Sequence, residues 1–320
     1  MVSTSKSEKG RASAGRRLKQ MRKTTPVEGF ASDGVGGEPR WRPNASFDCG
    51  WGNLHFAHTF ESTEALIAAI CSERPGRRDI AFYVSEPHVL LAQAPQELFL
   101  DPSHTFRNNL STYQPARSRP RGFLIRRMTT ARDAEQVNII YAARNMVPVP
   151  PQFFWSHRDD RAISVFVAED EKTGEVVGAV TGVDHSRAFD DPDHGSSLWC
   201  LAVDPQARHA RIGEALVRRV CEHFKARGAA YLDLSVLHDN NSAIALYEKL
   251  GFHRVPVFAV KRKNPINEKL FTGADQRLSG LNPYAEIIVN EALRRGIHVE
   301  VTDAAGGFFR LSYGGRSVHC

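Results

Sequence analysis

The sequence lacks the features that mark several classes of protein. Its five cysteines lie far apart in 320 residues and form no C-x-x-C pattern, which argues against a structural zinc site and a disulfide framework. No apolar run approaches the roughly 18 residues of a membrane helix. The N-terminus has no apolar segment of the secretory type. An odd number of widely spaced cysteines favours a reducing compartment, so we expect a cytoplasmic protein without a metal site and without a membrane partner.

The net positive charge of the chain is confined to its N-terminal end. The net charge is +6, but residues 1–25 alone carry eight Lys or Arg against Glu8, so the remainder sums to −1. A nearly neutral body does not predict a nucleic-acid binder, because phosphate contacts need a basic face. The N-terminus is Arg-rich, Ser-rich and acid-poor, as a transit peptide is. A solvated, disordered basic arm explains the same composition and is the favoured interpretation.

Composition and periodicity divide the chain into zones. Residues 1–40 are predicted to be a tail, and residues 41–115 a small α/β region with a short helix near Leu66 and strands at 79–84 and 89–92. Linkers are expected at 114–120 and at about 264–280. They flank the main domain, residues 121–263, and a C-terminal unit, residues 281–320.

The main domain alternates strand and helix signals. Strands are predicted at 123–128, 162–168, 176–183, 197–203 and 231–236, with a final strand pair over 252–261, and helices near 130–141, 211–227 and 240–250. Thr130 is a candidate helix cap, and Gly228 and Gly251 are natural helix stops. The predicted fold class is therefore α/β (α+β), with a mixed, mostly antiparallel sheet flanked by helices.

The stretch Val203-Asp-Pro-Gln-Ala-Arg-His-Ala-Arg-Ile-Gly-Glu-Ala-Leu216 is the most informative in the chain. A buried strand runs through a short loop directly into a helix, whose first backbone N–H groups have no internal partner. Together with the helix dipole, these groups form a site for an anion. Gly213 lets the backbone approach a ligand closely. A pyrophosphate is the natural occupant.

This junction and the segment Asn240-Asn-Ser-Ala-Ile-Ala-Leu-Tyr-Glu-Lys-Leu-Gly-Phe252 together resemble the GNAT superfamily of N-acetyltransferases. The usual first motif is Q/R-x-x-G-x-G/A. Arg208 fills its first position and Gly213 its last, but Arg211 stands where a glycine is expected. The second motif matches throughout. The resemblance covers about residues 121–263.

The resemblance implies that the domain binds acetyl-coenzyme A and transfers its acetyl group to a small-molecule amine. The backbone of Leu201 and Val203 would pair with the pantetheine arm, Asn240 would lie near it, and Tyr247 would protonate the leaving thiolate, as a phenol can at neutral pH. The implied pyrophosphate site is formed by Arg208, His209, Ala210, Arg211, Ile212, Gly213 and Glu214.

Plainer interpretations of the same residues stay open. Tyr247 lies on the apolar stripe of its helix and would serve equally as a core residue, whereas Asn240 is also a helix cap. The charges of Arg208 and Arg211 also fit a solvated turn. No single general base can be assigned. The acidic segment 184–194 offers carboxylates that would act directly or through water, or form a solvated loop. Trp199 and the aromatic run 153–155 would shape an acceptor pocket or belong to the core.

The C-terminal unit carries a second resemblance. Residues 291–301 and 309–318 look like the start of the ATP-grasp part of cyanophycin-synthetase-like ligases. An acetyltransferase followed by such a part resembles the bacterial N-acetylglutaminylglutamine synthetases, which implies glutamine or a glutamine dipeptide as acceptor. We expect an incomplete ATP-grasp-type domain without ligase activity. The alternatives are a catalytically weak acyl-CoA-binding module and a protein lysine acetyltransferase. The oligomeric state is left open.

Overall fold

The computed structural model describes residues 41–116, 120–272 and 280–320. The tail expected at 1–40 lies outside the described residues. The segment before the main domain forms a small set of strands and two helices. Its elements are β1 (Ser46–Asp48), β2 (Asn53–Phe56), the 3-10 turn η2 (Ala57–Thr59), α2 (Thr63–Cys71), β3 (Ile80–Val84), α3 (Pro87–Gln93), β4 (Leu98–Leu100) and β5 (Ser103–Asn109).

The main segment follows the predicted order closely, with two additional short helices. It contains β6 (Phe123–Arg127), α4 (Ala131–Ala143), α5 (Pro151–Ser156), β7 (Ile163–Asp170), β8 (Val176–Asp184), α6 (His185–Phe189), β9 (Gly195–Val203), α7 (Ile212–Ala226), β10 (Tyr231–Leu237), α8 (Asn241–Lys249), β11 (His253–Val255) and β12 (Phe258–Arg262). Thr130 caps α4 in a capping box with Asp133, as its position predicted.

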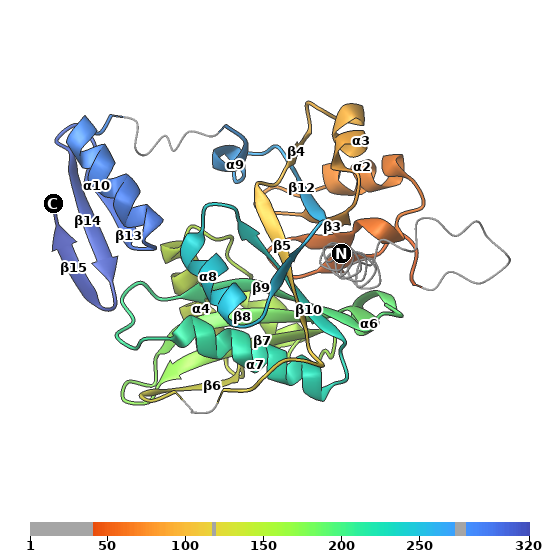
Figure 1. The fold of residues 1–320 in the computed structure, drawn as a ribbon, viewed down its shortest axis with the longest axis horizontal. Helices are drawn as coiled ribbons and strands as arrows, with labels where there is room; N and C mark the ends of the chain where they lie inside the picture. Colours follow the sequence, from red (N-terminus) through yellow and green to blue (C-terminus); the bar gives the residue numbers. More distant parts are fainter. Residues whose placement is uncertain (1–40, 117–119, 273–279) are drawn as a thin grey trace, which may run out of the picture. The chain divides into compact units, whose positions relative to one another are not determined.

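These strands form two sheets that exchange members. The larger sheet has the order β11-β5-β10-β9-β8-β7-β6, and the smaller one β1-β2-β3-β12-β4. Strand β5, which precedes the main domain in sequence, lies antiparallel between β10 and β11. Strand β12, which ends the main domain, lies antiparallel between β3 and β4, where Figure 1 shows it in blue beside the orange strands. Two strands, β5 and β12, therefore lie on the far side of the boundary expected between 41–115 and 121–263.

The exchange reveals an internal repeat. Each half of the chain contains a strand, a helix, a parallel neighbouring strand, a second helix and two more strands. In the smaller sheet the parallel pair β2-β3 is followed by β12, the last strand of the second half, and then by β4 of the first half. In the larger sheet the parallel pair β9-β10 is followed by β5, the last strand of the first half, and then by β11 of the second half. The order β2-β3-β12-β4 thus corresponds to β9-β10-β5-β11.

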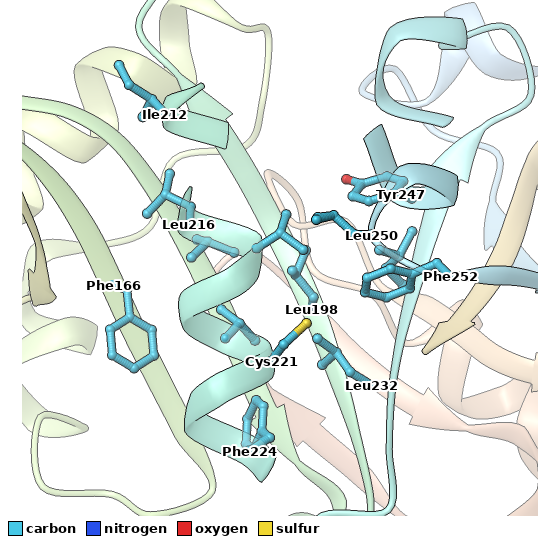
Figure 2. Close-up of a cluster of buried hydrophobic side chains, with 14 of the residues drawn as sticks. Phe166, Leu198, Ile212, Leu216, Cys221, Phe224, Leu232, Tyr247, Leu250 and Phe252 are labelled. Atoms are coloured by element: carbon cyan, nitrogen blue, oxygen red, sulfur yellow. The ribbon is translucent and has the colours of Figure 1, made fainter. Parts of the chain in front are cut away.

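The two cores lie on opposite outer faces of these sheets. Helices α2 and α3 cover the smaller sheet through residues such as Leu66, Ile70 and Leu90. Helix α7 covers the larger sheet, and Figure 2 shows its residues packed against Leu198 and Leu232. The inner faces meet, since Phe82 of β3 contacts Trp199 of β9 with ring centroids 5.1 Å apart. The inner faces of the two sheets therefore pack against each other and form a third buried layer between them.

The C-terminal unit is a helix on a three-stranded antiparallel sheet. Its helix α10 (Pro283–Arg294) begins at Asn282, whose side chain accepts hydrogen bonds from two backbone N–H groups. Gly314 and Gly315 both have positive φ in the two-residue turn between β14 and β15. A small apolar cluster that includes Val289 and Phe309 joins helix and sheet. The remaining elements are α9 (Glu268–Thr272), β13 (His298–Asp303), β14 (Phe308–Tyr313) and β15 (Arg316–His319).

Three predictions about local structure were wrong. Residues 89–92 belong to helix α3, because Pro87 occupies its first turn and fixes a helical φ. The final strands β11 and β12 join different sheets instead of pairing. The expected linker after residue 263 contains α9, and its residues 273–279 lie outside the described part.

Candidate active site

The larger sheet opens between two parallel strands. Strand β9 pairs with β10 only from Gly195 to Leu198, opposite Tyr231 to Leu234. Both strands continue beyond this point, to Val203 and Leu237, without pairing with each other. The larger sheet therefore has a gap at the carboxyl ends of β9 and β10, bordered on one side by α7.

A β-bulge in β9 marks the start of the gap. The register against β8 shifts between Ala179 and Thr181, which pair with Ala202 and Trp199, so β9 carries one extra residue. Cys200 in this bulge has φ +51°, a conformation uncommon for a side-chain-bearing residue. Burial raises the pKa of the Cys200 thiol to about 12, so it is protonated at neutral pH and is a poor nucleophile.

The backbone of β9 beyond the bulge faces the gap. The N–H of Asp204 donates to Val177 of β8 at 3.0 Å. Because backbone groups alternate along a strand, Val203 and Leu201 direct their N–H and C=O away from β8. The pairing of these two residues with a pantetheine arm stays a prediction. Arg144, which no sequence pattern singled out, donates from Nε to the Val203 carbonyl at 2.8 Å and so lies at this open edge.

The loop after β9 supplies unpaired backbone donors. The first helical bond of α7 runs from the N–H of Ala215 to the carbonyl of Arg211. Among the described residues, none of the six N–H groups from His209 to Glu214 donates to a hydrogen bond. Six successive free N–H groups at a helix start match the predicted anion site.

Arg211 adopts the backbone conformation that the missing glycine would favour. Its φ and ψ are 69° and 17°, in the left-handed region, and it precedes the first residue of α7. The loop therefore has a left-handed residue at position 211 although arginine replaces the glycine of the family motif. A non-glycine residue is strained in that region.

Most side chains of the loop point to partners of their own. His209 pairs with Asp170 of β7 at 2.7 Å, and Arg208 is exposed. Glu214 contacts Arg211, Arg218 and Lys249 at 3.3, 3.0 and 2.8 Å. Burial favours a neutral Glu214, but these cations outweigh it and lower its pKa to about 2. Its negative charge is thereby neutralised beside an anion site.

Helix α8 forms the far wall. Asn240 caps it through the N–H of Ala243 at 3.2 Å, which confirms the helix-cap interpretation. Tyr247 is 5% exposed and packs on Phe252, yet its hydroxyl makes no hydrogen bond within the described chain. Figure 2 shows this hydroxyl at the end of the ring that faces α7 and β9. Burial raises the pKa of Tyr247, so the phenol is protonated.

The corresponding junction of the first half lacks both features. Strand β2 pairs with β3 over Leu54, His55 and Phe56, so no gap opens. The N–H of Glu61 donates to Asn44, and that of Ala65 to the capping side chain of Ser62. The second half alone combines a gap with free backbone donors among the described residues.

The acidic segment 184–194 has structural roles. Asp184 caps α6 and pairs with Arg227, and Asp191 accepts hydrogen bonds from the N–H of Asp193 and Gly195. In the described ranges, no three His, Cys, Asp or Glu side chains gather to hold a metal ion. No helix there is both long enough and apolar enough to span a membrane.

The aromatic residues expected near the acceptor differ in their surroundings. Trp199 is buried next to the bulge, with its indole N–H bonded to Ser197 at 2.8 Å. Phe153 lies against Gly50 of the first half, and Trp155 is 54% exposed. Only Trp199 is next to the gap. A small pocket lined by Phe153 and Ile163 lies near the start of β7, away from the carboxyl ends of β9 and β10.

A bulged, splayed strand that leads into a helix with free N–H groups can hold an extended ligand with an anionic end. Residues 133–252 match the family model described as the acetyltransferase (GNAT) family. This part of the chain is similar to the GNAT-superfamily acetyltransferases. A mycothiol acetyltransferase of Thermobispora bispora is 29% identical over 166 residues, covering 49% of this chain and 55% of that protein. The chain thus spans about half the length of that relative.

Several solved structures are similar to the chain. A GCN5-related N-acetyltransferase from Sphaerobacter thermophilus is 18% identical, with a TM-score of 0.43, over 58% of this chain and 59% of that one. A tandem GNAT protein from the clavulanic acid biosynthesis pathway is 15% identical, with a TM-score of 0.45, over 68% and 77%. The predicted class, a mixed α/β fold with helices flanking the sheets, is confirmed.

Proposed function

We propose that the protein transfers an acetyl group from acetyl-coenzyme A to an amine. The observation that carries this proposal is the run of six free backbone N–H groups, 209–214, at the open end of the gap between β9 and β10. The run suits a pyrophosphate. The free edge of β9 at Leu201 and Val203 suits the amide groups of pantetheine.

The chain's residues would act mainly by holding the reactants together. Acetyl-coenzyme A supplies an activated thioester carbonyl. The acceptor nitrogen bonds to that carbon, the carbon–sulfur bond breaks, and the ammonium proton leaves to water. Tyr247 gives its proton to the departing thiolate and regains one from solvent. Burial raises the pKa of Tyr247, so the phenol is protonated at neutral pH and has a proton to donate.

The acceptor is proposed to be the α-amino group of glutamine or of a glutamine dipeptide. The support is the sequence resemblance of residues 291–301 and 309–318 to ligases of that chemistry. Acetylation of protein lysines and binding of acyl-coenzyme A without chemistry are the competing proposals. An acceptor screen read by mass spectrometry separates the three.

Gly213 offers a direct test of the cofactor site. A Cβ added there would lie 3.7 Å from Val203 and 3.9 Å from Leu246, so alanine fits at ordinary contact distances. A tryptophan would fill the space between β9, α7 and α8. Gly213→Trp should abolish acetyl-coenzyme A binding in calorimetry, while Gly213→Ala keeps it. Equal binding by all three proteins would show that the ligand does not use this junction.

Tyr247 tests the chemistry. Tyr247→Phe should lower kcat on the order of 100-fold, the usual range for a lost proton transfer. The fold should be unaffected, because the hydroxyl makes no hydrogen bond in the described chain. Thiol release under saturating substrates measures kcat, and thermal unfolding is the control. An unchanged kcat would leave Tyr247 as a core residue.

A further inference from the structure

The side chain of His209 ties the loop after β9 to the neighbouring strands β6 and β7. Its Nε2 lies 2.7 Å from Oδ2 of Asp170, and its ring packs on Phe123 with ring centroids 5.8 Å apart. Phe123 and Asp170 are cross-strand partners in β6 and β7, so the imidazole contacts both strands at one position along the pair. The first residue of the donor run 209–214 is thereby attached to two strands other than β9.

Asp170 is itself held in place. Its Oδ1 accepts hydrogen bonds from the N–H groups of Lys172 and Thr173 at 2.8 and 3.0 Å, which leaves Oδ2 for His209. The N–H of Thr173 and then the side chain of His209 lower the pKa of Asp170 to about 2, so this carboxylate is ionised at neutral pH. The ring nitrogen is therefore the donor, and a charged acceptor makes the hydrogen bond one of the stronger kind.

Gly122 leaves the space that the imidazole occupies. A Cβ added at Gly122 would lie 2.5 Å from Cε1 of His209, and the φ of +84° is unfavourable for any residue with a side chain. The carbonyl of Gly122 accepts a hydrogen bond from the N–H of Glu171 at 3.0 Å, which fixes the glycine beside the end of β7. The ring is thus confined on one side by Gly122 and bonded on another by Asp170.

The loop has few other attachments at this point. Of Arg208, His209 and Ala210, only His209 is hydrogen-bonded through its side chain within the described ranges. Arg211 follows in the left-handed conformation, and a strained residue persists only where its surroundings fix it. Backbone donors that are already aligned bind an anion more tightly, because no ordering cost then arises at binding.

We propose that the His209–Asp170 clamp positions the backbone N–H groups of 209–214 for the pyrophosphate of acetyl-coenzyme A, and that the imidazole itself does not contact the ligand. His209 and Asp170 are therefore positioning residues, and Gly122 makes room for the clamp. This inference rests on the proposed acetyl transfer and deepens it. It predicts a defect confined to the pyrophosphate end of the ligand, because the strand edge proposed for pantetheine belongs to β9, before the loop.

The test compares acetyl-coenzyme A with S-acetylpantetheine, an acetyl donor that lacks the pyrophosphate. His209→Ala should weaken coenzyme A binding in calorimetry about tenfold and raise KM for acetyl-coenzyme A by about the same factor, the scale of one charge-assisted hydrogen bond. The kcat should not change, and neither should kcat/KM for S-acetylpantetheine. His209→Gln should restore binding, because its amide Nε2 can still donate to Asp170.

Two variants change the clamp without touching His209. Asp170→Asn keeps the oxygen that the N–H groups of the turn use but loses the charge, and Gly122→Ala displaces the ring. Both should weaken coenzyme A binding and leave S-acetylpantetheine unaffected. The matched control is Glu171→Gln, which removes an exposed carboxylate from the same turn and should change neither donor. Thermal unfolding of each variant reports whether the fold is intact.

The outcomes separate the clamp from the transferase proposal. Coenzyme A binding that His209→Ala leaves unchanged would refute the clamp, and so would an equal loss with both acetyl donors or a loss of thermal stability alone. Acetyl transfer by the wild type would then still stand. Binding that is weakened in His209→Ala and restored in His209→Gln, with no acetyl transfer to any amine, would refute the transferase proposal and keep the clamp.

Discussion

A buried ion pair joins the two halves of the chain and offers the sharpest test of the strand exchange. Arg107 of β5 and Asp233 of β10 are cross-strand partners, with Nε–Oδ1 and Nη2–Oδ2 distances of 2.8 and 2.6 Å. The hydroxyl of Tyr83 in β3 donates to the same carboxylate at 2.7 Å. The guanidinium also lies over the ring of Tyr231, 3.6 Å from its centroid. Three strands from both sheets thus meet at one carboxylate.

Replacing Arg107 by methionine leaves Asp233 buried without its counter-ion. Arg107 and Asp233 are 3% and 0% exposed, so water cannot screen the remaining charge. Removing one partner of such a pair costs about 3–5 kcal/mol. Tyr83→Phe removes a single hydrogen bond to a charged group, worth about 1.5–3 kcal/mol. Against a total stability of about 5–15 kcal/mol, either loss is large.

Urea unfolding measures both losses as shifts of the transition midpoint at constant slope. The matched control is Arg295→Met, which removes an exposed pair with Glu291 of similar length, 2.7 Å, and should cost no more than about 0.5 kcal/mol. If Arg107→Met costs no more than Arg295→Met, then β5 does not lie between β10 and β11. A double-mutant cycle of Arg107→Met with Tyr83→Phe should show coupling, since both act on one carboxylate.

Three further outcomes are expected. Arg211→Gly should raise the free energy of unfolding by up to about 1 kcal/mol, and Arg211→Val should lower it, because φ is positive there; thermal unfolding gives the sign. In the folded protein the pKa values of Glu214 and Asp191 are lowered to about 2. Both carboxylates therefore stabilise the fold fully above their unfolded pKa of about 4, and this stabilisation is lost as the pH falls toward 2. Urea midpoints measured across that pH range should fall, and they should fall less for Asp191→Asn. Residues 121–263 alone lack β5, so they should give no cooperative unfolding transition, whereas residues 41–272 should.

The run of free N–H groups could be predicted because its signals are local. A buried strand, a short loop and an amphipathic helix follow each other within residues 197–227, and the free N–H groups are a necessary consequence of where α7 begins. The same holds for the cap at Asn240 and the stop at Gly251. The left-handed conformation of Arg211 follows from the family motif, because the loop geometry is set by its neighbours.

Residues brought together from distant segments left no such signal. Arg144 reaches Val203 from the end of α4, 59 positions away, and Trp51 reaches Trp199 from another half of the chain. Periodicity shows which face of a helix is buried and says nothing about what covers it. On α10, for example, Ala285 and Val289 face the sheet, whereas Ile287 and Ile288 are exposed.

The exchange of β5 and β12 explains why the last strands were misassigned. Adjacent strands joined by two residues usually pair as a hairpin, and β11 and β12 are separated only by Pro256 and Val257, with a bend at Pro256. Each strand instead completes a sheet of the opposite half. An exchange of this kind makes each half incomplete without the other. It also brings the inner face of the first half, which has no anion site of its own, against the bulge of β9.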